Sequence, residues 1–291
     1  MALQTNPELN SKIIYELNVQ NHSETHDFAG TEADLDRIKD LGVDIVWLMP
    51  IHPRGEKMKI GPCGSPYSVR DFRGVNPDYG DFASFQKLVD AIHARGMQVM
   101  LDIVYNHTSQ DSVLVEQHPE YFYQGPDGKP MYRFWNDVYD LDYSHEELCQ
   151  YMIETALFWA KLGVDGYRCD VAPMVPLSFW TRARAAMDQI NPNFVWLAET
   201  HHYPFLTKMR DRGYNLHCDA EMYQAFDITY DYDVHYFYED YLKGKGTLKQ
   251  YVDGLNRQKA MYPMNYIKLR FLENHDQARG CSLVHTDEQL A

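Results

Sequence analysis

The sequence lacks any long apolar run. No stretch of its 291 residues approaches the ~18 unbroken apolar residues that mark a membrane-spanning helix. The first ten residues are polar and lack the apolar core of a signal peptide. We therefore expect neither a membrane span nor a membrane partner, and we expect a cytoplasmic protein.

Positive charge and cysteine are also scarce. The chain has 27 Lys and Arg against 42 Asp and Glu, for a formal net charge of −15, which argues against a nucleic-acid partner. Its five Cys form no CxxC pair, so neither a zinc ribbon nor a disulfide framework is indicated. Tyr, by contrast, occurs 22 times, and such flat aromatic faces suit either sugar rings or ordinary packing.

Short apolar runs alternate with segments of helical period along the chain. We predict strands at 13–17, 44–49, 98–104, 162–170, 194–199, 216–221 and 267–271, the fourth beginning with the apolar run 162–165. Predicted helices begin at a Thr31 cap and at Asp81, and two more span 145–162 and 176–190. Seven strands alternating with helices predict an α/β protein with a parallel (β/α)8 TIM barrel.

One segment interrupts this alternation. Residues 109–144 follow the third predicted strand, show no clear helical period and are rich in Tyr, Asp and Gly. A loop of this length is usually functional or a small inserted subdomain. We therefore divide the chain into 1–108, the first part of the barrel, 109–144, a short insert, and 145–291, the remainder of the barrel.

Arg168 and Asp170 lie two residues apart on the fourth predicted strand. Side chains at that spacing point to the same side, which in a barrel is the interior. A fixed guanidinium would keep the Asp170 carboxylate negative, as a nucleophile requires. A purely structural ion pair explains these two residues equally well.

Polar residues recur where the predicted strands end. The third, fourth, fifth and seventh strands end in Asp102–His107, Arg168–Asp170, Glu199–His201 and Glu273–Asp276. Each carboxylate alone could cap the following helix, but four successive strand ends indicate a shared site at the barrel mouth.

Two chemistries suit such a site, namely glycoside cleavage by paired carboxylates and metal-assisted hydrolysis. Metal barrels typically bind the ion through His residues at short spacing, whereas the only adjacent pair here is His201 and His202. This favours glycoside cleavage.

The strand-end motifs, in their order and spacing, resemble the α-amylase family of retaining glycoside hydrolases. The matching segments are Asp102–His107, Gly166–Asp170, Glu199 and Phe271–Asp276, together with the loops 64–72 and 75–80. The resemblance covers nearly the whole chain. It implies a glycosidase acting on α-glucosidic bonds of α-glucans or maltooligosaccharides.

The resemblance also implies a role for each matched residue. Asp170 would be the nucleophile, and Glu199 the general acid and then the base. Asp276 would stabilise the transition state, and Arg168 would orient Asp170. Tyr67 would stack on the sugar ring, and His107 and His275 would bind sugar hydroxyls. Because Glu199 follows an apolar run, we expect desolvation to raise its pKa, as an acid requires.

The same resemblance leaves several properties open. A transglycosylase, a non-catalytic carbohydrate-binding member and an inactive fragment are the alternatives. Ser65 departs from the pattern of many α-glucosidases, and Val171 is a weak hint of α-1,6 bonds. No cofactor is required, although a calcium site involving Asn106 is allowed, with Asp111, Asp127, Asp137, Asp140 and Asp142 as further candidates.

The chain ends at Ala291, before the eighth β/α unit of that family's barrel. Unpaired strand edges are costly, because their backbone groups lack partners. We therefore expect the chain to be part of a longer polypeptide, or to be completed by a separate C-terminal segment or by self-association. As an isolated monomer we expect it to have little activity.

Overall fold

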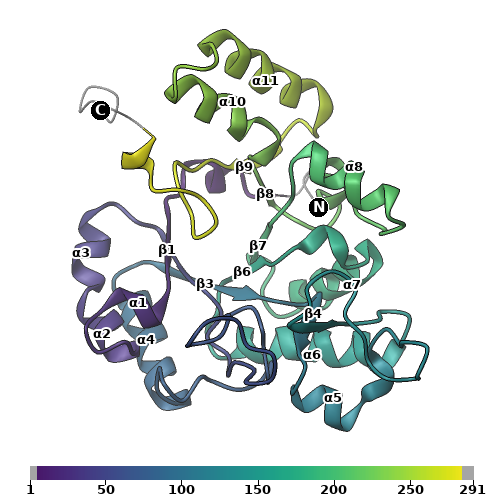
Figure 1. The fold of residues 1–291 in the computed structure, drawn as a ribbon. Coiled ribbons are helices and arrows are strands. Elements are labelled where there is room, and N and C mark those ends of the chain that lie inside the picture. The colour runs from purple at the N-terminus through teal and green to yellow at the C-terminus, as the bar shows by residue number, and fades with distance from the viewer. Residues whose placement is uncertain (1–4, 284–291) are drawn as a thin grey trace.

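The computed structural model describes residues 5–283 as a curled parallel sheet with helices packed around it (Figure 1). The sheet order is β1-β2-β3-β6-β7-β8-β9, and each neighbouring pair is parallel. Its strands are β1 (Ile14–Leu17), β2 (Ile45–Leu48), β3 (Gln98–Ile103), β6 (Gly166–Cys169), β7 (Val195–Ala198), β8 (Ile228–Tyr230) and β9 (Ile267–Leu269). The predicted TIM-barrel class is confirmed, with seven barrel strands in the described part.

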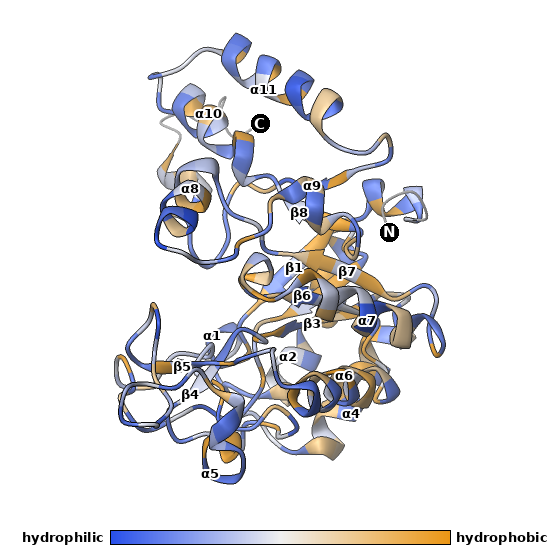
Figure 2. Ribbon diagram, turned by 90° about the vertical axis from the view of Figure 1, so that its right-hand side faces the viewer, coloured by the Kyte–Doolittle hydropathy of each residue, from blue (hydrophilic) through white to orange (hydrophobic). Residues whose placement is uncertain are grey.

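Helices follow most of the strands and cover the outer face of the sheet. They are α1 (Val19–His22), α2 (Phe28–Ala33), α3 (Leu35–Asp40), α4 (Phe82–Ala94), α6 (Glu146–Lys161), α7 (Leu177–Asp188), α8 (Tyr203–Asp211), α9 (Asp219–Met222), α10 (Tyr232–Leu242) and α11 (Leu248–Met261). Short 3-10 turns are η2 (Pro7–Ser11), η3 (Pro119–Tyr121), η4 (Ala172–Met174) and η5 (Gly280–Ser282). Figure 2 shows apolar, orange strands near the centre of the molecule, surrounded by helices that contain both polar and apolar residues.

The two faces of the sheet build two separate cores because side chains alternate along a strand. Trp47 and Met100 belong to the inner cluster, which fills the barrel interior. Their strand neighbours Val46 and Leu101 belong to the outer cluster, which packs against the helices. Trp159 of α6 sits in this outer core and donates its indole N–H to the carbonyl of Phe72 at 2.8 Å.

The segment between β3 and α6 forms a small unit of its own. Strand β4 (His107–Ser109) pairs antiparallel with β5 (Val138–Asp140), and the short helix α5 (Val113–Gln117) lies between them in sequence. Since β4 starts at His107, only four residues after β3 ends, this unit is anchored directly at the mouth of the barrel.

Two predictions of local structure around helix ends were wrong. Thr31 lies inside α2, whose N-cap is Asp27, and a second helix begins after Asp34. Residues 162–165 are not strand: Leu162 is the C-cap of α6 and Gly163 has φ +92°. A glycine in this left-handed conformation ends the helix, so residues 162–165 cap α6 and lead into β6 rather than forming its start.

The sixth barrel strand was also placed wrongly. The range 216–221 overlaps helix α9, whereas the strand is Ile228–Tyr230. A Glu221 side chain that accepts the backbone N–H of Cys218 caps this helix and fixes the local fold. The β-branched and aromatic residues of β8 fit a strand better.

Gly166, the first residue of β6, leaves no room for a side chain. A Cβ there would lie 2.9 Å from the carbonyl oxygen of Val195 and 3.0 Å from its Cβ. We expect Gly166→Ala to lower the free energy of unfolding by roughly 1–3 kcal/mol, because the neighbouring backbone of β7 must move. Thermal unfolding measures this as a lowered midpoint. Gly125→Ala is the control, since its nearest atom belongs to the end of the Asp127 side chain; equal losses in both variants would contradict the steric explanation.

Candidate active site

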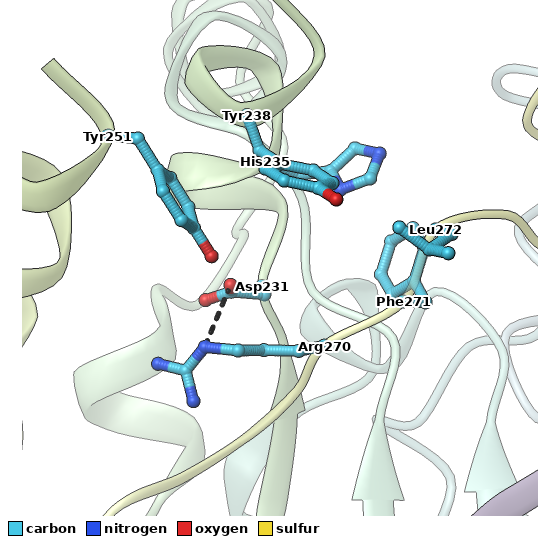
Figure 3. Close-up of a pocket in the computed structure, with 7 residues that line it drawn as sticks. All are labelled: Asp231, His235, Tyr238, Tyr251, Arg270, Phe271 and Leu272. Carbon is cyan, nitrogen blue, oxygen red and sulfur yellow. Dashed lines mark ion pairs between the residues drawn. The ribbon is translucent and has the colours of Figure 1, made fainter. Parts of the chain in front are cut away.

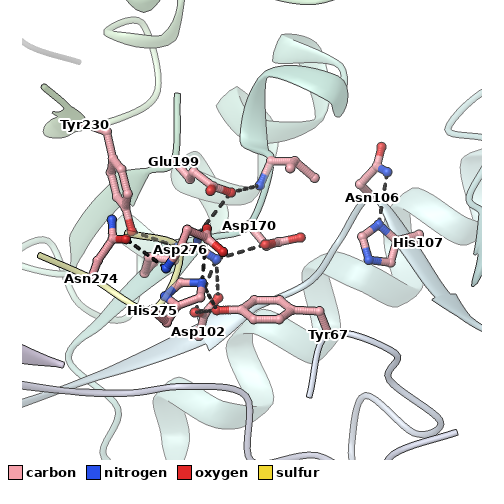
Figure 4. A network of polar contacts seen from close by, with 12 residues as sticks. Tyr67, Asp102, Asn106, His107, Asp170, Glu199, Tyr230, Asn274, His275 and Asp276 are labelled. Carbon is pink, nitrogen blue, oxygen red and sulfur yellow. Dashed lines mark hydrogen bonds and ion pairs between the residues drawn. The ribbon is translucent and has the colours of Figure 1, made fainter. Parts of the chain in front are cut away.

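A polar cluster lies in the barrel mouth (Figure 4). The guanidinium of Arg168 contacts three of its carboxylates. Its side chain is 0% exposed. Nη1 donates to Oδ1 of Asp102 and to Oδ1 of Asp170, at 2.9 Å each. Nη2 lies 3.0 Å from Oε2 of Glu199, and Nε donates to the hydroxyl of Tyr230 at 3.2 Å. One cation therefore joins carboxylates from three neighbouring strands.

Strand register brings these groups together. Asp102 of β3 is paired with Arg168 of β6, so both face the interior side by side. The ladder then continues one residue beyond each strand: the N–H of Asp170 donates to the carbonyl of Ile103, and the N–H of Glu199 to that of Cys169. Asp170 and Glu199 are thus held by regular backbone pairing at the rim of the barrel.

Val171 has an unusual backbone conformation. Its φ and ψ are 37° and 39°, in the left-handed region. This conformation costs a β-branched residue roughly 1–2 kcal/mol. In this conformation the Val171 N–H donates a hydrogen bond to Oε2 of Glu199 at 2.7 Å. Local strain of this kind is typical of functional sites, where the surrounding structure enforces it.

The carboxylates do not titrate as the sequence suggested. Burial, together with the charge of Glu199, raises the pKa of Asp170 to about 7, although Arg168 opposes this. Burial also raises the pKa of Asp102 to about 7 against the opposing charge of Arg168. Burial thus makes Asp102 and Asp170 easier to protonate than free carboxyl groups, and the charge of Arg168 only partly offsets this effect.

The expected rise in the pKa of Glu199 is wrong for this conformation. Burial does disfavour its charged form, but the charge of Arg168 and the N–H of Val171 outweigh burial and lower the pKa. The apolar strand before Glu199 correctly indicated desolvation. It could not indicate that the carboxylate contacts a guanidinium from the neighbouring strand.

A second part of the network lies on the other side of Asp102. The hydroxyl of Tyr67 is 2.9 Å from Oδ2 of Asp102 and 2.9 Å from Nε2 of His275, and the two rings stack at 5.3 Å. Nε2 of His275 is also 3.4 Å from Oδ2 of Asp276, whose side chain is 54% exposed. The structure thus brings Tyr67, Asp170, Glu199, His275 and Asp276 together at the mouth (Figure 4). Arg168 and Asp102 join them into one contiguous group.

His107 and Asn106 lie beside this group. Nδ1 of His107 is 3.2 Å from the side-chain amide of Asn106, and the His107 ring lies 5.3 Å from that of Trp135. His107 also contacts the backbone of Tyr67, and burial lowers its pKa. A neutral imidazole at this position can still bind a hydroxyl.

The residues near Asn106 do not assemble a metal site in the described part of the chain. Within residues 5–283, no three His, Cys, Asp or Glu side chains converge as ligands. The carboxylates named with Asn106 bond to their own surroundings; for example, Asp111 accepts the N–H of Glu56 and Asp140 that of Arg133. Calcium stays a prediction from the resemblance.

Sequence reasoning missed four contributors to the site: Glu16, Trp47, Asp102 as a partner of Arg168, and Tyr230. Trp47 donates its indole N–H to Asp102 at 3.3 Å, and Glu16 lies 2.5 Å from Nδ1 of His275. Glu16 and Asp102 gave a signal, because each is a charged residue within a strand of otherwise apolar character. Trp47 gave none, since it sits in a wholly apolar strand.

A pocket of about 340 Å³ lies elsewhere, between α10, α11 and the segment after β9 (Figure 3). Its floor holds an ion pair in which Nε of Arg270 is 3.4 Å from Oδ2 of Asp231. None of its lining residues belongs to the Arg168 network. We therefore define the candidate site by the cluster of carboxylates around Arg168 and not by this pocket.

A barrel whose strand ends gather carboxylates around a buried arginine is the architecture of TIM-barrel hydrolases that use paired carboxylates. The chain belongs to the alpha-amylase family: the family model described as "Alpha amylase, catalytic domain" matches residues 16–128 and 130–291.

Known proteins of this kind cover most of the chain. The crystal structure of an alpha-amylase from Lactobacillus plantarum is 53% identical, with a TM-score of 0.94 over 97% of this chain and 67% of that one. The intracellular maltogenic amylase of Bacillus subtilis is 27% identical over 91% of this chain. An alpha-1,4-glucan:maltose-1-phosphate maltosyltransferase of Cereibacter sphaeroides is 29% identical over 67% of this chain. The chain spans 45% and 33% of the lengths of these two curated relatives.

The helices of residues 5–283 include none that is both long and apolar enough to cross a bilayer.

The raised pKa of Asp170 has a consequence for stability. A carboxyl whose pKa is higher when folded binds more protons in the folded state, so stability falls as pH rises from about 4 to about 7. Asp170→Asn removes this penalty, and we expect it to be more stable than the wild type by roughly 1–3 kcal/mol at pH ~8, but not at pH ~4. Thermal unfolding at both pH values measures the difference. With exposed Asp127→Asn as control, a gain independent of pH would contradict the buried-charge account.

Proposed function

We propose that the protein is a retaining glycoside hydrolase that cleaves α-glucosidic bonds of α-glucans or maltooligosaccharides through a covalent glycosyl-enzyme intermediate. The observation that carries this proposal is the pair Asp170 and Glu199, held on either side of Arg168 at adjacent strand ends. Retaining enzymes need two carboxyl groups close together, one as nucleophile and one as acid and base. The names of the amylase relatives support the same substrate class.

Asp170 is the proposed nucleophile. Arg168 binds its Oδ1, which makes Oδ2 the attacking oxygen and restricts the rotation of the carboxylate. Its side chain is 10% exposed at the mouth, so a sugar can reach it while bulk water is largely excluded. Such fixed geometry lowers the entropic cost of attack.

Glu199 is the proposed acid and base, and it must carry the proton when the leaving group departs. In the free enzyme its contacts with Arg168 and Val171 disfavour that form. A glycosidic oxygen that takes the place of either contact would remove the stabilisation of the charge and raise the pKa of Glu199. Asp170, whose pKa burial raises, is a neighbouring carboxyl that can supply this proton, and loss of the proton leaves Asp170 ionised for attack.

Asp276 and the stacked pair of Tyr67 and His275 complete the proposed sugar subsite. Tyr67 provides an aromatic face, and His275 and His107 provide hydrogen-bonding nitrogens. The exposed carboxylate of Asp276 supplies negative charge at the mouth, where an oxocarbenium-like transition state develops positive charge.

Transfer to an acceptor sugar is the second candidate function, favoured by the maltosyltransferase among the relatives. Both reactions share the same intermediate and differ in whether water or a sugar attacks it. Product analysis with maltooligosaccharides, isomaltose and starch, with and without added acceptor, separates the two. A non-catalytic role is less favoured, because both carboxylates are present. We also propose a cytoplasmic location, consistent with the name of the Bacillus subtilis relative.

Replacing the nucleophile should abolish turnover without unfolding the protein. We expect Asp170→Asn to reduce kcat by at least roughly 10³-fold, because an amide cannot form the intermediate. Hydrolysis of maltooligosaccharides by the full-length protein measures the effect, and Asp127→Asn is the matched control. Turnover of Asp170→Asn at the control's rate would overturn the assignment of Asp170.

The role of Glu199 can be tested by leaving-group dependence. We expect Glu199→Gln to slow hydrolysis of maltooligosaccharides far more, by roughly 10²-fold or greater, than that of activated aryl glycosides, whose leaving groups need little protonation. The exposed Glu24→Gln serves as control for the same chemical change. If Glu199→Gln loses the same factor on both substrate types, Glu199 is not the acid.

A further inference from the structure

A chain of four side chains crosses the mouth of the barrel from β1 to β3, and Figure 4 shows three of them, His275, Tyr67 and Asp102. Glu16 of β1 contacts Nδ1 of His275 at 2.5 Å, and Nε2 of His275 contacts the Tyr67 hydroxyl at 2.9 Å. The Tyr67 hydroxyl in turn lies 2.9 Å from Oδ2 of Asp102. Because these contacts are continuous, the hydrogens along them can be assigned by counting donors and acceptors.

The count starts at Asp102, which faces two side chains that can only donate. Arg168 reaches its Oδ1 at 2.9 Å, and the indole of Trp47 reaches its Oδ2 at 3.3 Å. This is the environment of an acceptor, so the single hydrogen of the Tyr67 hydroxyl points to Asp102. The hydroxyl oxygen can then only accept from His275, which places a hydrogen on Nε2.

The other ring nitrogen faces a carboxylate. Glu16 can accept but not donate, so its short contact places a second hydrogen on Nδ1. We propose that Glu16 is a positioning residue that keeps His275 doubly protonated, so that the sugar subsite proposed above presents an imidazolium and not a neutral imidazole.

The charges around His275 support this assignment. Burial and the nearby Arg168 disfavour the imidazolium, whereas Glu16 and Asp276 favour it, and the balance raises the pKa of His275. The rings of Tyr67 and Trp47 complete its surroundings, at 5.3 and 6.2 Å. Asp102, Asp170 and Glu199 also interact with its charge. The group with the shortest contact is Glu16, so it is the residue to change.

This arrangement has a use in the proposed reaction. In the free protein Nε2–H of His275 is bound to the Tyr67 hydroxyl. When a sugar hydroxyl takes the place of that oxygen, an imidazolium donates a stronger, charge-assisted hydrogen bond to it than a neutral ring does. A lone cation would oppose the positive charge of an oxocarbenium-like transition state. The pair of Glu16 and His275 has no net charge, so it supplies the stronger donor without that repulsion.

The protonation state is measured directly by nitrogen NMR of the histidine side chains, with His275→Asn to assign the signal. We expect both ring nitrogens of His275 to be protonated at pH ~7, and Glu16→Gln to lower its pKa by about one pH unit or more. Glu16→Asp should give an intermediate value, and the exposed Glu24→Gln should leave it unchanged. A neutral His275 at pH ~7, or a Glu16→Gln variant with an unaltered titration, would overturn the inference.

The pH dependence of hydrolysis gives the second readout. We expect the loss of kcat/KM at high pH to begin about one pH unit lower in Glu16→Gln than in the wild type, with little change at pH ~5, where His275 is protonated in both. A uniform loss at every pH would indicate a merely structural role and contradict the proposal. Because the NMR titration does not depend on turnover, an inactive protein with the expected titration would reject the proposed function and leave the role of Glu16 standing.

Discussion

The buried guanidinium of Arg168 is the constraint on which the rest of the mouth depends. A charge removed from water is costly unless partners surround it, and leaving such a charge without any compensating partner typically costs about 3–5 kcal/mol. Here the partners come from β3, β6, β7 and β8, through Asp102, Asp170, Glu199 and Tyr230. The geometry of the candidate site therefore depends on the geometry of the barrel, because the strands must keep their register for the cation to be neutralised.

The same cluster shows how a fold maintains groups that are unfavourable for stability. Three carboxylates compete for one guanidinium, and two of them have pKa values of about 7. Val171 adds backbone strain next to the proposed nucleophile. These costs are offset by the two apolar clusters on either side of the sheet, which hold the strand ends in place. Groups that are unfavourable in the free protein can be stabilised when a substrate or transition state binds to them. This difference in stabilisation lowers the barrier to reaction.

Sequence reasoning recovered the barrel class and brought five site residues to one place, because strand periodicity and polar strand ends are local signals: Arg168, Asp170, Glu199, His275 and Asp276. Tyr67 was predicted only from the family resemblance. The sequence-based prediction was wrong where one local pattern is compatible with two different secondary structures. The run 162–165 is apolar whether it ends a helix or starts a strand, and only Gly163 decides it. The predicted pKa shifts of Asp170 and Glu199 were wrong for a different reason. These shifts depend on which carboxylate faces which nitrogen of Arg168, and that contact is made between strands.

A second buried cation shows how a structural charge cluster differs from a functional one. Lys268 of β9 is fully buried and contacts the carboxylates of Asp219 and Asp233, the carbonyl of Tyr230 and the ring of Tyr262.

Its partners are occupied in turn: Asp233 also binds Tyr262 at 2.8 Å and Gln258 at 3.1 Å. This cluster faces the helices and joins β9 to α9, α10 and α11. The partners of Arg168, by contrast, line the mouth, where Asp276 is half exposed and Asp170 can be reached. The two buried cations on one sheet therefore differ in whether their carboxylates face other protein groups or the open mouth of the barrel.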